Sequence, residues 1–124
     1  MIQRDHLTEK VIGCALEVHR ALGPGLLESA YEKCLARELA IAQVSFRQQV
    51  SIPVEYKGVH LDCGFRIDLL VEDRLIIELK AVERVQEIHK AQILSYMKLS
   101  GINTGLILNF NVQLLKDGIT RFKL

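Results

Sequence analysis

Residues 63–80 read CGFRIDLLV, EDR and LIIELK, two apolar runs separated by three charged residues. Large aliphatic and β-branched residues on either side of a short charged corner predict a β-hairpin. Asp68, Glu78 and Lys80 stand inside the apolar runs, where an unpaired charge is unfavourable by several kcal/mol. The hairpin must therefore include groups that compensate these charges.

The alternation of side chains along a strand places Glu78 and Lys80 on one face of this hairpin. If residues 72–74 form the loop, Asp68 lies opposite Glu78 on the neighbouring strand. Two carboxylates that face each other repel, and a divalent cation between them offsets the repulsion. The alternative is that Asp68 and Glu78 are ordinary charges at strand ends and that Lys80 is a surface residue. The pattern alone does not separate these interpretations.

Composition limits the class of protein. The chain of 124 residues is 49% hydrophobic, which fits one globular domain over residues 1–124. A net charge of +1 gives no bulk positive field, so nucleic-acid binding would need a local site. Three widely spaced cysteines predict buried apolar side chains rather than disulfides or a zinc site. Charged residues near the N-terminus, without an apolar run of about 18 residues, predict a soluble, cytoplasmic protein that binds no membrane.

The N-terminal region predicts a first helix. Apolar residues recur with helical spacing from Leu7 to Leu22, and Asp5 or Thr8 is available as the N-cap. His19 lies at the edge of this apolar stripe, which favours a packed histidine over a ligand.

A second helix is predicted over residues 26–42. It follows Gly-Pro-Gly at residues 23–25, which suits a helix end and a new helix start, so the two helices form a hairpin. Glu28 lies in the first turn, where a carboxylate complements the helix dipole. The side chains predicted to point inward are Leu27, Tyr31, Cys34, Leu35 and Leu39.

The rest of the chain predicts strands around one further helix. Residues 50–56 alternate as a half-exposed strand, which Pro53 restricts to a sheet edge, and a turn at residues 57–58 follows. Residues 105–110 predict an apolar strand parallel to its neighbour, and residues 119–123 a short last strand.

The further helix is predicted over residues 86–99, between the charged hairpin and the parallel strand. Its predicted packing stripe consists of Ile88, Ala91, Leu94 and Met97. A second stripe beside it consists of His89, Gln92 and Tyr96.

The order Asp68, Glu78-x-Lys80 on a hairpin resembles the PD-(D/E)xK nuclease superfamily, although Ile67 stands where that motif has proline. Residues 25–31, GLLESAY, resemble the signature of the small bacterial GxxExxY proteins, a group with PD-(D/E)xK nuclease-like folds. Further segments extend the resemblance over nearly the whole chain: residues 17–19, 63–71, 77–83 and 108–111.

The resemblance implies an α/β fold, with a mixed β-sheet flanked by helices, a restriction-endonuclease-like core and an N-terminal helical hairpin. It also implies a metal-dependent nuclease that hydrolyses phosphodiester bonds, with DNA as its partner. Mg²⁺, or Mn²⁺ in its place, would be held by Asp68, Glu78 and the backbone carbonyl of Leu79. Lys80 would act in catalysis beside the two carboxylates. In related exonuclease-type nucleases an acidic residue on an early helix joins the metal site, which by analogy assigns Glu28 as a further ligand.

Residues 92–96 resemble the Q-x-x-x-Y element that follows Glu-x-Lys in the exonuclease branch of the superfamily. This implies that Gln92 and Tyr96 face the site and contact the nucleic acid. The alternative is a partly buried Tyr96 beside a solvated Gln92.

A second functional hypothesis is a catalytically silent nuclease fold that serves as a binding or assembly module, as a homo-oligomer or with a partner protein that supplies targeting. Small size and near-neutral charge favour this hypothesis, because no separate recognition domain is present. The set Asp68, Glu78 and Lys80 favours the nuclease, because a relict site has no physical reason to keep charges in buried strands.

Overall fold

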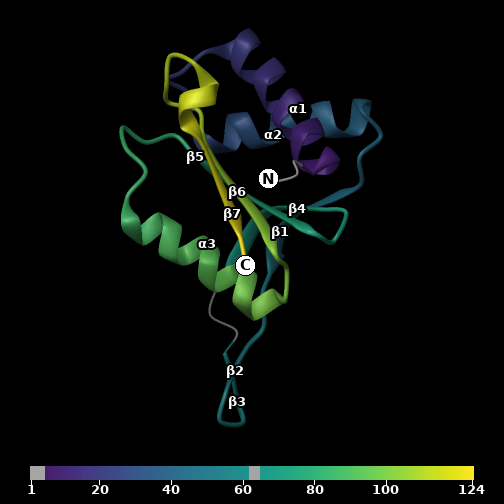
Figure 1. The fold of residues 1–124 in the computed structure, drawn as a ribbon, viewed down its shortest axis with the longest axis vertical. Helices are drawn as coiled ribbons and strands as arrows, with labels where there is room; N and C mark the ends of the chain where they lie inside the picture. The colour runs from purple at the N-terminus through teal and green to yellow at the C-terminus, as the bar shows by residue number, and fades with distance from the viewer. Residues whose placement is uncertain (1–4, 62–64) are drawn as a thin grey trace.

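The computed structural model describes residues 5–61 and 65–124, so Cys63 and Gly64 of the predicted hairpin lie outside the described residues (Figure 1). The elements are α1 (His6–Leu22), α2 (Glu28–Ile41), β1 (Phe46–Ser51), β2 (Val54–Tyr56), β3 (Val59–Leu61), β4 (Arg66–Val71), β5 (Leu75–Lys80), α3 (Glu87–Ser100), β6 (Thr104–Asn109), η1 (Leu115–Gly118) and β7 (Ile119–Lys123).

The main sheet has five strands in the order β1-β4-β5-β6-β7. The β5–β6 pair is parallel and the other pairs are antiparallel, which confirms the predicted mixed sheet and its parallel strand. One face of the sheet packs on α1 and α2 and the other on α3, so the sheet is covered on both sides (Figure 1). Both faces of β5 are consequently buried, which is why its sequence is almost continuously apolar.

The predicted helical hairpin is confirmed by α1 and α2. Asp5 is the N-cap of α1, and its side chain accepts a hydrogen bond from the backbone N–H of Leu7 at 3.2 Å. His19 is buried and its Nε2 lies 2.8 Å from the carbonyl oxygen of Val112. Because a carbonyl only accepts, the ring nitrogen donates this bond, and His19 is the packed histidine that the sequence predicts.

Tyr31 fixes the connection between the two helices. Its hydroxyl donates to the carbonyl of Gly23 at 2.6 Å and accepts from the backbone N–H of Leu26 at 3.1 Å. Its ring stacks on Phe110 at the end of the parallel strand, with 4.4 Å between centroids. The prediction that Leu27 packs inward is wrong, since its side chain is 76% exposed. Leu27 is the N-cap of α2, so it precedes the periodic face of the helix.

The predicted continuous strand over residues 50–56 is wrong. The chain leaves the main sheet after β1, and β2 and β3 form a separate two-stranded hairpin that projects from one end of the molecule (Figure 1). Pro53 lies between β1 and β2, where its missing N–H interrupts pairing. The turn at Lys57 and Gly58 is confirmed, with φ of 48° and 84°.

The helix α3 is confirmed, but its predicted packing stripe is only partly right. Met97 is buried and Leu94 packs against the core as predicted, whereas Ile88 is 61% exposed and Ala91 is exposed. The helix also buries Ile93 and Tyr96. The cause lies in β6, where Gly105 leaves room for the helix to approach. A Cβ at Gly105 would lie 2.9 Å from Met97 Sδ and 3.0 Å from Ile93 Cδ1. The close approach selects the helix face that carries Ile93 and Met97.

We expect Gly118→Ala to lower the free energy of unfolding by about 2–3 kcal/mol, because its Cβ would overlap the backbone carbonyl oxygen of Asn109. Gly13→Ala is the matched control, since a Cβ there meets open space on α1 and alanine favours a helix by about 1 kcal/mol. Urea unfolding of both variants measures the difference. A Gly118→Ala protein as stable as Gly13→Ala would contradict the expected overlap.

Candidate active site

The β4–β5 hairpin has the register that the sequence predicts. Leu69 pairs with Ile77 and Val71 with Leu75, around the three-residue turn at 72–74. Glu72 and Asp73 adopt left-handed backbone conformations there, with φ of 50° and 54°. The same register continued by one residue places Asp68 opposite Glu78.

At Asp68 and Glu78, the two carboxylates bind the backbone of the opposite strand. The backbone N–H of Asp68 donates to Glu78 Oε1 at 3.1 Å, and the backbone N–H of Leu79 donates to Asp68 Oδ2 at 2.9 Å. Each carboxylate therefore accepts a hydrogen bond from the strand that carries the other. This exchange fixes both side chains and brings them together.

The strands beside the carboxylates are distorted. Gln49 of β1 lies between the residues paired with Leu69 and Ile67, and it has a φ of 51°, an unusual conformation for a residue other than glycine. Ile67 and Leu70 pack in the same cluster with α3, whereas Leu69 packs with α1 and α2. Strict alternation would place Ile67 on the same face as Leu69, so it fails at Asp68. Such local strain is common at functional sites.

The carboxyl group of Glu78 is electrostatically unusual. Its side chain is 8% exposed, and burial followed by repulsion from Asp68 raises its pKa to about 8. The N–H of Asp68 and the charge of Lys80 lower the pKa without cancelling those effects. At neutral pH and without a cation, Glu78 therefore retains its proton.

This pair of carboxylates fits a divalent cation. Carboxylate oxygens are the ligands that Mg²⁺ and Mn²⁺ prefer, and a cation would offset the repulsion that raises the pKa of Glu78. Lys80 is half-buried at the end of β5, and its positive charge lowers the pKa of Glu78. The structure thus brings Asp68, Glu78 and Lys80 together.

Glu28 is not brought to this pair. It is exposed in the first turn of α2, where its charge complements the helix N-terminus. Among residues 5–61 and 65–124, no group of three or more His, Cys, Asp or Glu side chains is arranged to hold a metal ion. The acidic residue of α2 that is linked to Asp68 is Glu32, one helical turn later.

Glu32 and Gln49 are the residues that sequence reasoning missed. Gln49 Nε2 donates to Glu32 Oε1 at 2.8 Å and to Asp68 Oδ1 at 3.3 Å. The spacing of Glu28 and Glu32 on one helix face was a usable signal for Glu32. Only the pairing of β1 with β4 reveals Gln49, since it depends on contacts distant in sequence.

The two residues predicted to contact nucleic acid differ in their surroundings. Tyr96 is buried, and its pKa is raised first by burial and then by the negative charges of Glu78 and Asp68. The ring of Phe65 packs edge-on against the ring of Tyr96, with 5.8 Å between the ring centroids. Gln92, one turn earlier on α3, is exposed. Tyr96 is therefore within electrostatic range of the two carboxylates, whereas Gln92 lies at the surface.

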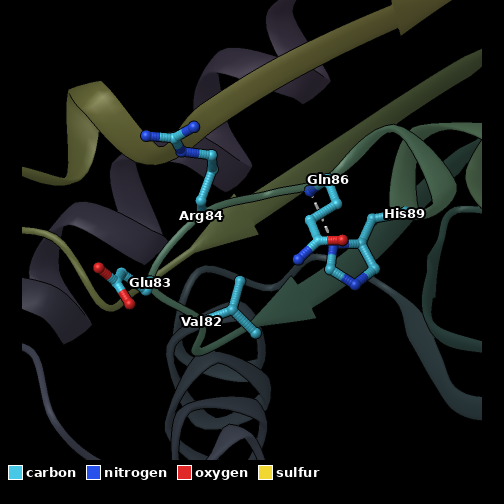
Figure 2. Close-up of a pocket in the computed structure, with 5 residues that line it drawn as sticks. All are labelled: Val82, Glu83, Arg84, Gln86 and His89. Atoms are coloured by element: carbon cyan, nitrogen blue, oxygen red, sulfur yellow. Dashed lines mark hydrogen bonds between the residues drawn. The ribbon is translucent and has the colours of Figure 1, made fainter.

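Asn109 holds the segment that follows Lys80. Its buried side chain donates to the carbonyl of Val82 at 2.9 Å and accepts from the N–H of Val82 at 3.1 Å. This segment and the start of α3 line a cavity of about 600 Å³ (Figure 2). The residues that line the cavity are Val82, Glu83, Arg84, Gln86 and His89. The Nδ1 atom of His89 accepts from the N–H of Gln86 at 3.0 Å, which caps the helix.

A mixed sheet between helices, with Asp and Glu-x-Lys on its central hairpin, defines a restriction-endonuclease-like nuclease fold. A family model described as the PD-(D/E)XK nuclease superfamily matches residues 5–122, and the chain belongs to this superfamily. No curated protein and no solved structure matches the chain. The match does not test the narrower GxxExxY resemblance, which stays a prediction. Within the described residues, no helix has the length and apolar character needed to cross a membrane.

We expect the cation-free protein to lose stability as the pH rises from about 4.5 to about 8, because Glu78 has a pKa of 4.5 when unfolded and about 8 when folded. Between these two pH values the folded state holds the Glu78 proton more tightly than the unfolded state does. The stability of the folded state is therefore highest below the lower pKa, and this contribution of Glu78 is lost above the higher pKa. Denaturant unfolding in chelator at several pH values measures the effect. Glu78→Gln cannot titrate and should show a flatter profile than the unsubstituted protein, while parallel profiles would contradict the raised pKa.

Proposed function

We propose that this protein is a metal-dependent nuclease that hydrolyses phosphodiester bonds, with DNA as its substrate. The observation that carries the proposal is the adjacent pair of Asp68 and Glu78, each bound to the other's strand, with Lys80 beside them. Membership of the PD-(D/E)XK nuclease superfamily supports this assignment.

In this proposal Asp68, Glu78 and the backbone carbonyl of Leu79 hold Mg²⁺ or Mn²⁺. A metal ion held there would supply an acidified water molecule and a polarised phosphate. The chain itself supplies oriented oxygens, because the N–H groups of Asp68 and Leu79 fix the two carboxylates before any ligand arrives. Glu78 gives up its proton on binding the ion, so binding strengthens as the pH rises toward its pKa.

Lys80 contributes to the transition state rather than to the cation site. An ammonium group cannot ligate a metal ion, but it can orient the attacking water and stabilise charge that develops on the phosphoryl oxygens. Its half-buried position strengthens that interaction, because the surrounding dielectric constant is lower than in water.

The nucleic acid would lie along α3 in this proposal. Tyr96 is buried within electrostatic range of Glu78 and Asp68, and Gln92 presents an amide at the surface one helical turn away. An exposed amide and a phenol hydroxyl are hydrogen-bond partners for phosphate and sugar oxygens. Contacts of this kind position a strand without reading its sequence.

We expect Lys80→Ala to reduce metal-dependent cleavage by at least about 100-fold while leaving the fold and most Mn²⁺ affinity intact. Asp68→Ala should remove both cleavage and Mn²⁺ binding, because it deletes a ligand oxygen. The two variants separate transition-state stabilisation from ion binding. Calorimetric Mn²⁺ titration and cleavage assays on single- and double-stranded DNA and on RNA measure the two effects.

Thermal unfolding in chelator is the control for folding in both variants. Equal loss of Mn²⁺ binding in the two variants, or full activity in Lys80→Ala, would remove Lys80 from the mechanism. Nucleic-acid binding by the unsubstituted protein without cleavage under any metal would favour the silent binding module instead.

A further inference from the structure

We propose that Gln49 is a positioning residue that orients the carboxylate of Asp68, and that Glu32 on α2 holds Gln49 in place. This inference rests on the proposed function, in which Asp68 is a cation ligand. It assigns α2 a role through Glu32, although the sequence points to Glu28.

Two hydrogen bonds link α2 to Asp68 through Gln49, and a third joins α2 to the neighbouring Gln48. Gln49 Nε2 donates to Glu32 Oε1 at 2.8 Å and to Asp68 Oδ1 at 3.3 Å. Gln48 Nε2 donates to the other carboxylate oxygen of Glu32 at 3.0 Å. Both oxygens of Glu32 are therefore engaged, and the Gln49 amide bridges Glu32 and Asp68.

The backbone of β1 is shaped for this bridge. Neighbouring side chains on a regular strand point to opposite faces, yet Gln48 and Gln49 both reach Glu32. The left-handed conformation of Gln49, with a φ of 51°, breaks the alternation and makes this possible. Glutamine has no intrinsic preference for that conformation, so its contacts must compensate the strain.

The bridge completes the orientation of Asp68. The N–H of Leu79 binds Oδ2 and the Gln49 amide binds Oδ1, so each carboxylate oxygen has one fixed partner. Each oxygen keeps a further lone pair for a cation. Because the amide is neutral, it orients Asp68 without neutralising the charge that attracts the ion. A hydrogen-bond partner of this kind typically changes metal affinity by about 10–100-fold.

The first experiment compares Gln49→Met with Gln48→Met by Mn²⁺ titration in the absence of nucleic acid. Methionine keeps the length of the side chain but cannot donate, and it leaves the backbone strain similar at either position. We expect Gln49→Met to weaken Mn²⁺ binding by about tenfold, because the contact is exposed and the effect should fall at the low end of that range. Gln48→Met should change it much less, since no contact joins Gln48 to Asp68 among the described hydrogen bonds. Equal weakening in both variants, or wild-type affinity in Gln49→Met, would overturn the inference.

The second comparison uses Glu32→Ala and Glu28→Ala, which remove the same charge one helical turn apart. Glu32→Ala should weaken Mn²⁺ binding and Glu28→Ala should not. The double variant Gln49→Met/Glu32→Ala should bind no more weakly than Gln49→Met, because Glu32 acts through Gln49. If the losses of Mn²⁺ affinity in the two single variants add in the double variant, Glu32 does not act through Gln49. Should Gln49→Met fail to fold, Glu32→Ala, which leaves Gln49 unchanged, decides the question.

A metal-free measurement separates this inference from the proposed function. The side-chain amide resonances of Gln49, observed by ¹H–¹⁵N NMR in chelator, should shift on Glu32→Ala and on Asp68→Asn and not on Glu28→Ala. If the unsubstituted protein binds no Mn²⁺, the proposed function fails, and the resonances alone decide whether Gln49 bridges the two carboxylates. Unchanged resonances in the Glu32 and Asp68 variants would overturn the bridge, even in a protein that binds Mn²⁺.

Discussion

Two carboxylates held within an apolar sheet are the constraint on which the rest of this structure depends. Glu78 is buried beside Asp68, and their mutual repulsion adds to the cost of removing charge from water. In the hairpin, the backbone N–H of Asp68 donates a hydrogen bond to Glu78, and the backbone N–H of Leu79 donates one to Asp68. Hydrogen bonds from the backbone satisfy the acids locally, so the sheet can stay apolar on either side of them.

The surrounding elements are arranged around that exchange. At the distorted position Gln49, a side-chain amide links Glu32 of α2 to Asp68. The parallel strand β6 places Asn109 against the segment beyond Lys80. The close packing at Gly105 sets the face of α3 that presents Tyr96 to the site. A helix on each face of the sheet thus contributes to one site at the end of β5, which neither helix could form alone.

How far the sequence predicts this arrangement depends on the range of the interactions. Strand parity and a three-residue corner suffice to place Asp68 opposite Glu78, because both are local to one hairpin. The contact face of α3 is not predictable from its own periodicity, since Gly105 on another strand selects it. Gln49 and its link to Glu32 are not predictable for the same reason, because the link depends on a left-handed backbone and on a helix distant along the chain.

The energetics of the pair bear on the choice between a nuclease and a silent module. Apolar residues of similar size in place of a buried charged pair often leave stability unchanged or raise it. A fold used only for binding or assembly elsewhere on its surface therefore has no physical need for Glu78, whose burial and repulsion from Asp68 disfavour its charged form. A divalent cation would explain why two carboxylates are kept together, because it binds two oriented anions directly. Burial beside Asp68 raises the pKa of Glu78, and the proposed nuclease chemistry gives a reason for that unfavourable arrangement.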